Sequence, residues 1–388
     1  MNFDDTAVAF QSKSDRDLKR THFVFSTMKK PWMVKAGTFF TTLALRLQFP
    51  VKGIIKRTIF SQFCGGESIK DCQATISQLG AFNVKTILDY SVEGQEEERS
   101  FDAAMEEALR VADFARDNPN IPFCVLKLTG LGSKTLMKKV QDGEDLTFDE
   151  SAAVTRMKER VMTVAKRAAE NGLKFMLDAE ESWIQNTIDE VSYELMLQLN
   201  RKQPVVYTTY QFYRHEALHK MKSAYERITA DGAHFAAKLV RGAYMETERD
   251  RARELGYTDP IQPDKQATDR DFNLAQEFII DHIDRFAMCA GTHNEHSSAL
   301  LVRLMKEKGL AKNDPRVYFA QLLGMSDNIS YKLADEGYNV AKYVPYGPVA
   351  KVLPYLFRRA EENTSIAGQS SREFSLVTRE LLRRKHNR

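Results

Sequence analysis

From residue 84 onward the chain alternates between short apolar runs and long charged stretches. The short runs are rich in β-branched and aromatic residues, as buried strands are, and the stretches between them have the length and spacing of helices. Eight strands are predicted, at residues 84–89, 123–128, 173–178, 204–210, 235–240, 286–290, 317–320 and 339–343. Because strict alternation favours a parallel sheet, and eight units fill roughly 280 residues, the pattern predicts an α/β fold, a closed (β/α)8 barrel of the TIM type.

Helices are predicted after each of these strands, and more precede them. The helices of the barrel are expected at residues 95–116, 149–171, 183–199, 214–230, 267–285, 296–308, 328–336 and 349–362. Residues 1–80 are expected to form an N-terminal helical arm, with helices near 6–26 and 31–60, and residues 81–388 the barrel domain. The second arm segment mixes aromatic and basic side chains, so it can pack on the barrel, which we favour, or lie on a membrane surface.

Charge and cysteine content restrict the classes of partner. The chain holds 56 Lys and Arg against 53 Asp and Glu, a net charge of +3, so no overall field argues for nucleic acid. Four scattered cysteines predict neither a disulfide scaffold nor a cysteine zinc site. The longest uncharged stretch near the N-terminus, residues 36–45, is too short to cross a bilayer. Two acids among the first five residues are unlike a transit or signal peptide, so such an address is expected to be absent or removed.

Polar or ionisable side chains follow almost every predicted strand. Any one of them is what the end of a strand in a soluble protein usually carries. In a barrel, however, the carboxyl ends of all strands meet at one face, where functional sites lie. The residues at these ends are Asp89, Lys127, Asp178, Gln211, Arg241 with Tyr244, Thr292 with His293 and Asn294, Gln321 and Tyr343. Taken together they predict a site at that face.

Two adjacent arginines lie in the last predicted barrel helix. Arg358 and Arg359 project about 100° apart on a helix, so their planar guanidinium groups can grip one carboxylate from two sides. Tyr355 lies one turn earlier and would add a wall to such a pocket. The alternative is a solvated helix face on which Arg358 pairs with Glu362, four residues on.

Two further groups of residues follow the third and fifth strands. Lys238 and Arg241 precede Gly242 and Ala243, a small-residue step that lets a flat ring or a phosphate approach the backbone. A basic strand end with a tight turn would look the same. Asp178 opens a cluster of three carboxylates, for which general acid or base, metal ligand and helix N-cap all stay open.

One motif suggests a different class of enzyme. His215, Glu216 and His219 form an H-E-x-x-H sequence, which on a helix can bind zinc beside a glutamate base, as in metallopeptidases. The motif lacks an evident third ligand, and Lys220 and Lys222 add positive charge beside it. Coincidence on a polar helix is favoured, and no metal is expected.

Five ordered motifs resemble those of one known family. They are Leu177-Asp-Ala-Glu-Glu181, Lys238-Leu-Val-Arg-Gly-Ala-Tyr244, Thr292-His-Asn294, Gln321-Leu-Leu-Gly-Met325 and Tyr355-Leu-Phe-Arg-Arg-Ala-Glu-Glu-Asn363. The chain resembles the proline dehydrogenases, which are flavin-dependent (β/α)8 barrels, over essentially its whole length, and the animal mitochondrial branch most closely. The resemblance implies FAD as cofactor and oxidation of L-proline to pyrroline-5-carboxylate by hydride transfer from C5 to flavin N5. It also implies a quinone acceptor, reached from the matrix side of the mitochondrial inner membrane.

The resemblance also assigns roles to individual residues. Expected flavin contacts are Asp178, Ala179, Gln211, Lys238, Arg241, Gly242, Ala243, Thr292, His293, Asn294 and Glu362. Expected substrate contacts are Lys127, Tyr244, Leu322, Tyr343, Tyr355, Arg358 and Arg359, with the two arginines on the carboxylate. The catalytic set it implies is Lys127, Asp178, Lys238, Tyr343, Arg358 and Arg359, in which Lys127 and Asp178 match an ion pair. Bacterial members usually carry the basic residues of the fifth-strand motif in the reverse order, arginine first.

A sister activity on the same scaffold is the nearest alternative. Hydroxyproline dehydrogenases resemble this chain but carry a smaller residue in place of Tyr343. A large phenol against C4 of the substrate ring leaves little room for a hydroxyl group, so the sequence favours proline over hydroxyproline.

Overall fold

The eight predicted strands are confirmed. The computed structural model describes residues 1–30, 32–34, 36–38, 52–90, 97–365 and 369–387, with the backbone alone at 361–365 and 369–370. The strands form a closed barrel in chain order. They are β1 (Val84–Tyr90), β2 (Phe123–Leu126), β3 (Lys174–Leu177), β4 (Val206–Gln211), β5 (Phe235–Val240), β6 (Phe286–Gly291), β7 (Val317–Leu322) and β8 (Val340–Tyr346).

A helix follows each strand, as predicted, and the described residues contain further helices that the pattern did not predict. The expected ones are α7 (Glu98–Ala115), α9 (Phe148–Glu170), α10 (Ser182–Leu199), α11 (Ala217–Ala230), α13 (Lys265–Asp281), α14 (Glu295–Glu307), α15 (Asp327–Asp335) and α16 (Val349–Ser365). The further helices include α6 (Ile69–Gly80), α8 (Lys134–Asp142), α12 (Met245–Leu255) and α17 (Gln369–His386). In α8 only Met137 is buried, and in α12 only Glu248 and Ala252, so neither has the apolar stripe that reveals a helix.

The chain divides into two compact units. One comprises residues 1–93 and 321–388, and the other residues 94–320. The first contains the parallel pair β1 and β8, in register from Val84 opposite Val340 to Tyr90 opposite Tyr346. The second contains the parallel ladder from β2 to β6, together with the first part of β7. The expected division into an arm and a barrel at residue 80 stays a prediction.

Aromatic packing fixes the strands of the unit 94–320. Phe235 of β5 meets Phe286 of β6 edge to face at 4.9 Å, and Tyr225 of α11 stacks on Phe286 at 5.4 Å between ring centroids. Each such pair contributes about 0.5–1.5 kcal/mol beyond its buried area. These ring contacts hold β5, β6 and α11 together below the polar groups that follow the two strands.

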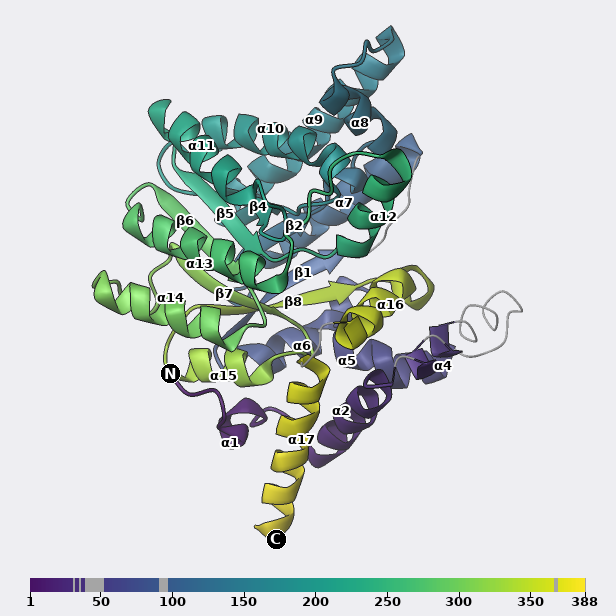
Figure 1. The fold of residues 1–388 in the computed structure, drawn as a ribbon, viewed down its shortest axis with the longest axis vertical. Coiled ribbons are helices and arrows are strands. Elements are labelled where there is room, and N and C mark those ends of the chain that lie inside the picture. The colour runs from purple at the N-terminus through teal and green to yellow at the C-terminus, as the bar shows by residue number, and fades with distance from the viewer. Residues whose placement is uncertain (31, 35, 39–51, 91–96, 366–368, 388) are drawn as a thin grey trace. The chain divides into compact units, whose positions relative to one another are not determined.

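The first and last helices of the chain pack together. Figure 1 shows α2 (Asp15–Met28), in purple, beside α17, in yellow, and α1 (Thr6–Ala9) lies against α17 as well. Phe10 and Leu18 are buried against Leu376 and Val377. A capping box with Ser14 as N-cap begins α2. Helices in the predicted segment 6–26 are thus confirmed.

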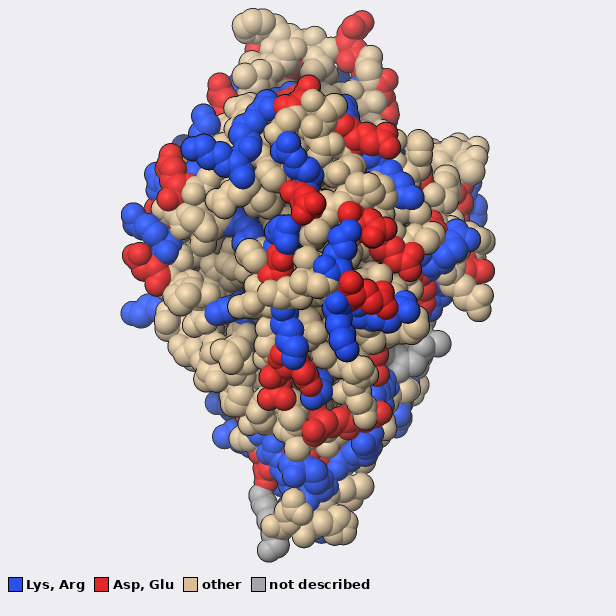
Figure 2. All heavy atoms as spheres, turned by 90° about the vertical axis from the view of Figure 1, so that its left-hand side faces the viewer, with Lys and Arg blue, Asp and Glu red and all other residues tan. Residues whose placement is uncertain are grey.

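The second predicted arm helix, at residues 31–60, falls partly on residues outside the described part. Its described end contains α4 (Lys52–Ile55) and a π-helical turn, η1 (Lys56–Phe60), and continues into α5 (Ser61–Phe63). Within the described ranges, no helix combines the length and the apolar character that a membrane span requires. On the face that Figure 2 shows, basic and acidic side chains are mixed over most of the surface, in keeping with the net charge of +3.

Candidate active site

An ion pair lies at the carboxyl end of the third strand. Asp178 follows β3, and its Oδ1 pairs with the Lys238 ammonium of β5. Their side chains are only 13% and 7% exposed, respectively, so each charge compensates the desolvation of the other. The pair joins two residues that the sequence placed in the site. The expected partnership of Asp178 with Lys127 stays a prediction. The structure places Lys127 close enough to Glu180 for its charge to oppose, in part, the rise that burial causes in the pKa of that carboxyl.

The guanidinium of Arg241, just after β5, is held from three sides. Its Nε donates to Asp269 Oδ1 at 2.7 Å, Nη1 to Thr292 Oγ1 at 2.6 Å and Nη2 to Ser297 Oγ at 3.0 Å. The group also lies over the Phe272 ring, 4.5 Å from its centroid. Burial lowers the pKa of Arg241, but an arginine keeps its charge at neutral pH. The structure thus brings Arg241 and Thr292 together and fixes a cation there.

Gly242 occupies a position that suits glycine alone. Its φ is +130°, a conformation that L-residues rarely adopt, and a Cβ there would lie 2.3 Å from the ring of Tyr213. Gly242 and Ala243 are both exposed, which leaves the backbone open beside Arg241. Tyr244 is the half-buried N-cap of α12.

The loop after β6 is ordered by its own polar groups. Thr292 Oγ1 accepts a hydrogen bond from the Asn294 backbone N–H at 3.1 Å. The Asn294 side chain caps α14, accepting from the Ser297 N–H at 3.0 Å. His293, between them in sequence, is half-buried. Asn294 therefore has a structural role, as the N-cap of α14, that was not predicted from the sequence.

Glu180 is a buried residue that the sequence analysis did not single out. Its carboxylate accepts hydrogen bonds from the Thr129 backbone N–H at 3.1 Å and the Thr129 hydroxyl at 2.6 Å. Its backbone carbonyl accepts from Gln211 Nε2 at 2.6 Å, which ties the exit of β4 to that of β3. Ala179, next to it, is half-buried. The cluster of three acids within residues 178–181 was the available signal, but the sequence does not indicate which of them is buried.

A second buried carboxyl connects to Glu180 through one side chain. Gln185 accepts a hydrogen bond from the Glu180 backbone N–H at 2.9 Å and donates to Asp189 Oδ1, also at 2.9 Å. Burial raises the pKa of Glu180 to about 7, against the opposing effects of Lys127 and the Thr129 hydrogen bonds. Burial likewise raises the pKa of Asp189 to about 6.

These two carboxyls make stability fall as the pH rises. Because both bind a proton more tightly in the folded than in the unfolded chain, their stabilisation is present below about pH 4 and is lost as the pH passes 6 and 7. At about 1.4 kcal/mol per unit of pKa, Glu180 alone accounts for about 3 kcal/mol. Urea unfolding from pH 5 to 8 should show a decline that Glu180→Gln flattens, whereas Glu254→Gln, at an exposed position, should leave it unchanged. An equally steep decline in Glu180→Gln would contradict the assignment.

The unit 1–93 and 321–388 carries the remaining predicted residues. Tyr343 of β8 and Tyr355 of α16 are buried, and Leu322 at the end of β7 is half-buried. Arg358 and Arg359 are half-buried on α16, and the Arg359 guanidinium lies 5.3 Å from the centroid of the Tyr355 ring. Within this unit the structure therefore brings Tyr355 and Arg359 together. The side chain of Glu362 falls outside the described residues.

The H-E-x-x-H sequence does not lie on one helix. His215 and Glu216 precede α11, which begins at Ala217, so the two histidines do not share a regular helical face. The Glu216 carboxylate is bound by Arg214 and by Lys220, the latter at 2.9 Å. In the part of the chain that the structure describes, no three His, Cys, Asp or Glu side chains are arranged to hold a metal ion.

Comparison with known proteins gives relatives over most of the chain. The carbapenem antibiotics biosynthesis protein CarD of Pectobacterium carotovorum subsp. carotovorum is 36% identical over 335 residues, 86% of each chain. Human proline dehydrogenase 1, mitochondrial, is 42% identical over 248 residues, 61% of this chain and 40% of that one. Hydroxyproline dehydrogenase of Xenopus laevis is 30% identical over 428 aligned residues, 100% of this chain and 91% of that one.

A solved structure and a family model agree with these relatives. Proline utilization A (PutA) of Bdellovibrio bacteriovorus, solved after inactivation by N-propargylglycine, shares the fold with a TM-score of 0.75 at 19% identity, over 93% of this chain. This chain spans 42% of that PutA chain. The family model described as proline dehydrogenase matches residues 72–372, more than half of the chain. The chain belongs to the proline dehydrogenase family.

Proposed function

We propose that this protein oxidises L-proline to pyrroline-5-carboxylate with FAD as its bound cofactor. The observation that carries the proposal is the family match over residues 72–372, a segment that contains every residue to which the sequence analysis gave a role. Arg358 and Arg359 would bind the substrate carboxylate, because paired planar guanidinium groups fix both its position and its orientation. Tyr343, Tyr355 and Leu322 would enclose the ring. FAD, when bound, supplies the hydride acceptor.

The residues proposed to hold FAD suit its chemistry. Arg241 offers a fixed cation, three of whose five N–H groups make the hydrogen bonds described above, which leaves capacity for a diphosphate oxygen. The exposed backbone at Gly242 and Ala243 permits the close approach of a flat ring or a phosphate. Lys238, held by Asp178, adds a buried positive charge suited to the reduced, anionic ring.

An absorbance spectrum tests this function directly. The purified protein should show the yellow flavin bands, and anaerobic L-proline should bleach them, whereas L-alanine should not. A flavin spectrum that proline leaves unchanged would mean that the barrel binds the cofactor without this activity. Bound zinc without a flavin spectrum would instead select the metallopeptidase reading of His215 and His219.

Hydroxyproline dehydrogenase is the second candidate, because a relative of that name aligns with the whole chain. Tyr343 decides between the two in our proposal. The Tyr343 side chain is 8% exposed on β8, so a smaller residue there opens space next to the substrate ring. Tyr343→Ser should shift the ratio of kcat/KM from L-proline toward trans-4-hydroxy-L-proline by about tenfold, the order expected when a pocket loses steric exclusion. The same ratio in wild type and variant would contradict this steric account.

A quinone is the proposed electron acceptor, and the mitochondrial inner membrane the proposed location, because several relatives are named as mitochondrial. Peripheral attachment is supported by the arm, where Trp32 and Ile54 are each 68% exposed next to basic residues. Turnover with a soluble ubiquinone analogue and sedimentation with cardiolipin-containing vesicles test these two points. No nucleic acid partner is proposed.

A further inference from the structure

The loop between β7 and α15 has a backbone that needs support. β7 ends at Leu322, and α15 begins five residues later at Asp327. Between them Gly324 and Ser326 both have positive φ, +77° and +50°. The left-handed conformation is unfavourable for a residue with a side chain, so Ser326 stays there only if its surroundings hold it.

A buried lysine supplies one such support. Lys342 of β8 is fully buried, and its ammonium pairs with Asp327 Oδ1 at 2.9 Å. The same ammonium donates to the backbone carbonyl of Met325 and, at 3.4 Å, to that of Leu322. One cation therefore fixes both the first and the last part of the loop.

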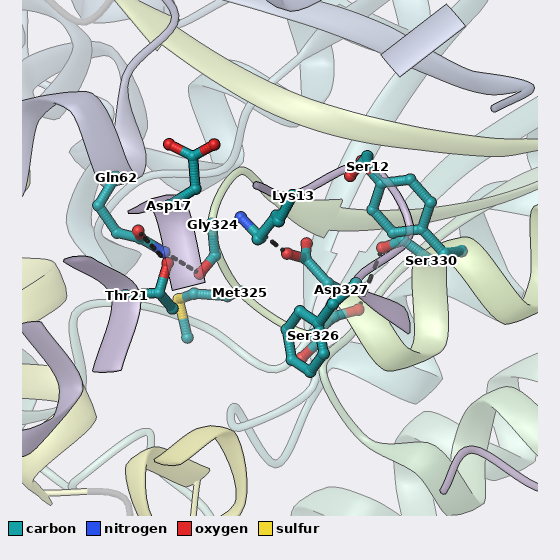
Figure 3. A network of polar contacts seen from close by, with 12 residues as sticks. Ser12, Lys13, Asp17, Thr21, Gln62, Gly324, Met325, Ser326, Asp327 and Ser330 are labelled. Carbon is teal, nitrogen blue, oxygen red and sulfur yellow. Dashed lines mark hydrogen bonds and ion pairs between the residues drawn. The ribbon is translucent and has the colours of Figure 1, made fainter. Parts of the chain in front are cut away.

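The N-terminal arm supplies further supports, as Figure 3 shows, beside that of Glu373 in α17, whose Oε1 accepts a hydrogen bond from the Ser326 N–H. Lys13 pairs with the second oxygen of Asp327, Oδ2, at 3.2 Å, so this carboxylate is shared between the arm and β8. Gln62 Nε2 donates to the Gly324 carbonyl at 2.9 Å, and Gln62 Oε1 accepts from the Thr21 hydroxyl at the same distance. Side chains near the beginning and near the end of the arm, Lys13 and Gln62, thus contact Asp327 and Gly324, respectively.

The supported backbone continues into two residues proposed to line the substrate ring. Lys342 and Tyr343 are neighbours on β8, and their side chains point to opposite faces of the strand. The Tyr343 carbonyl accepts a hydrogen bond from the Leu323 N–H at 2.8 Å. A movement of Asp327 or Lys342 would therefore displace Leu322 and Tyr343 together.

We propose that Lys13, Asp327 and Lys342 form a relay of positioning residues through which the N-terminal arm sets the affinity of the amino-acid site. The proposal rests on the function proposed above. None of the three touches the substrate in this scheme; they fix the backbone that presents Leu322 and Tyr343. The relay begins outside the segment that the family model matches, since Lys13 precedes residue 72. Because it supports ring contacts alone, it should act on KM rather than on kcat.

Substitutions of Lys13 test the relay at its most exposed member, since its side chain is 16% exposed, against 7% for Asp327 and 0% for Lys342. In the flavin-loaded full chain, Lys13→Met should raise the KM for L-proline about fivefold and leave kcat within about twofold, as expected for a displaced wall of a binding site. Lys13→Arg should restore the wild-type KM. Lys19→Met, at an exposed position of the same arm, is the matched control. A wild-type KM in Lys13→Met would overturn the relay, as would loss of flavin in proportion to activity.

Hydrogen exchange separates failure of the relay from failure of the proposed function. In Lys13→Met the amides of residues 322–327 should exchange faster than in wild type, whether or not the protein turns over proline. If wild type does not oxidise proline, the proposed function fails, and the exchange result alone decides whether Lys13 holds the loop. Unchanged exchange in that peptide would overturn the relay in either case.

Discussion

Replacing Arg358 or Arg359 by Met is expected to raise the KM for L-proline about a hundredfold while most of the flavin stays bound. A hydrogen bond between charged groups contributes about 1.5–3 kcal/mol, and its loss also leaves the substrate carboxylate without a counter-charge. Arg359 lies over the Tyr355 ring, so its removal should additionally loosen that wall. Steady-state kinetics with a dye acceptor, together with flavin absorbance per protein, measure the two effects separately.

The matched control lies on the same helix. Lys351→Met removes an exposed cation from α16 and should leave KM unchanged. Loss of flavin as the sole effect of the arginine substitutions would refute their assignment to the carboxylate. An equal rise in KM for Lys351→Met would mean that general charge, rather than paired guanidinium groups, attracts the substrate.

The largest loss of stability is expected from Asp327→Asn. This substitution leaves the ammonium of Lys342, which is fully buried in the folded chain, beside a neutral amide. Removing one partner of a buried pair costs about 3–5 kcal/mol, because the remaining charge stays desolvated. Urea unfolding of the variant should therefore show a midpoint far below that of wild type.

A double variant separates two effects of Asp327→Asn. One is the lost attraction between Asp327 and Lys342, and the other is the cost of a buried ammonium without a counter-charge. Adding Lys342→Met to Asp327→Asn removes the stranded cation and should recover at least half of the lost free energy. Lys13→Met alone should cost less than about 1 kcal/mol, since a partly exposed lysine can return to water. Strictly additive losses in the double variant would show that Lys342 and Asp327 do not depend on each other.

The strands were predictable because each is a short, largely apolar run between long charged stretches, and most contain β-branched or aromatic residues. The helices α8 and α12 were not, since almost none of their side chains is buried. Pairings between distant positions were also beyond reach. In the sequence, Lys342 is a single charged residue inside an apolar run. Nothing nearby in the sequence indicates that its ammonium pairs with Asp327, or that Lys13 pairs with the same carboxylate.

The candidate site was predictable to a similar extent. The positions at strand ends and the family resemblance identified the residues of the candidate site. They did not identify the side chains with which those residues form hydrogen bonds and ion pairs. The contact of Arg241 with Ser297 and that of Lys238 with Asp178 each join residues that are far apart in the chain. Glu180 is one of three acids within residues 178–181, and its burial depends on packing that the local sequence does not record.

The unit formed by residues 1–93 and 321–388 has a consequence for the order of events during synthesis. β1 leaves the ribosome early, yet its ladder partner β8 and the helix α17 that covers the arm come from the last seventy residues or so. Residues 94–320 can fold while residues 1–93 still lack β8 and α17, against which they pack. Chains arrested near residue 320 should therefore lose the N-terminal segment to a protease and keep the middle. The start of this protein becomes stable only when its end has been made.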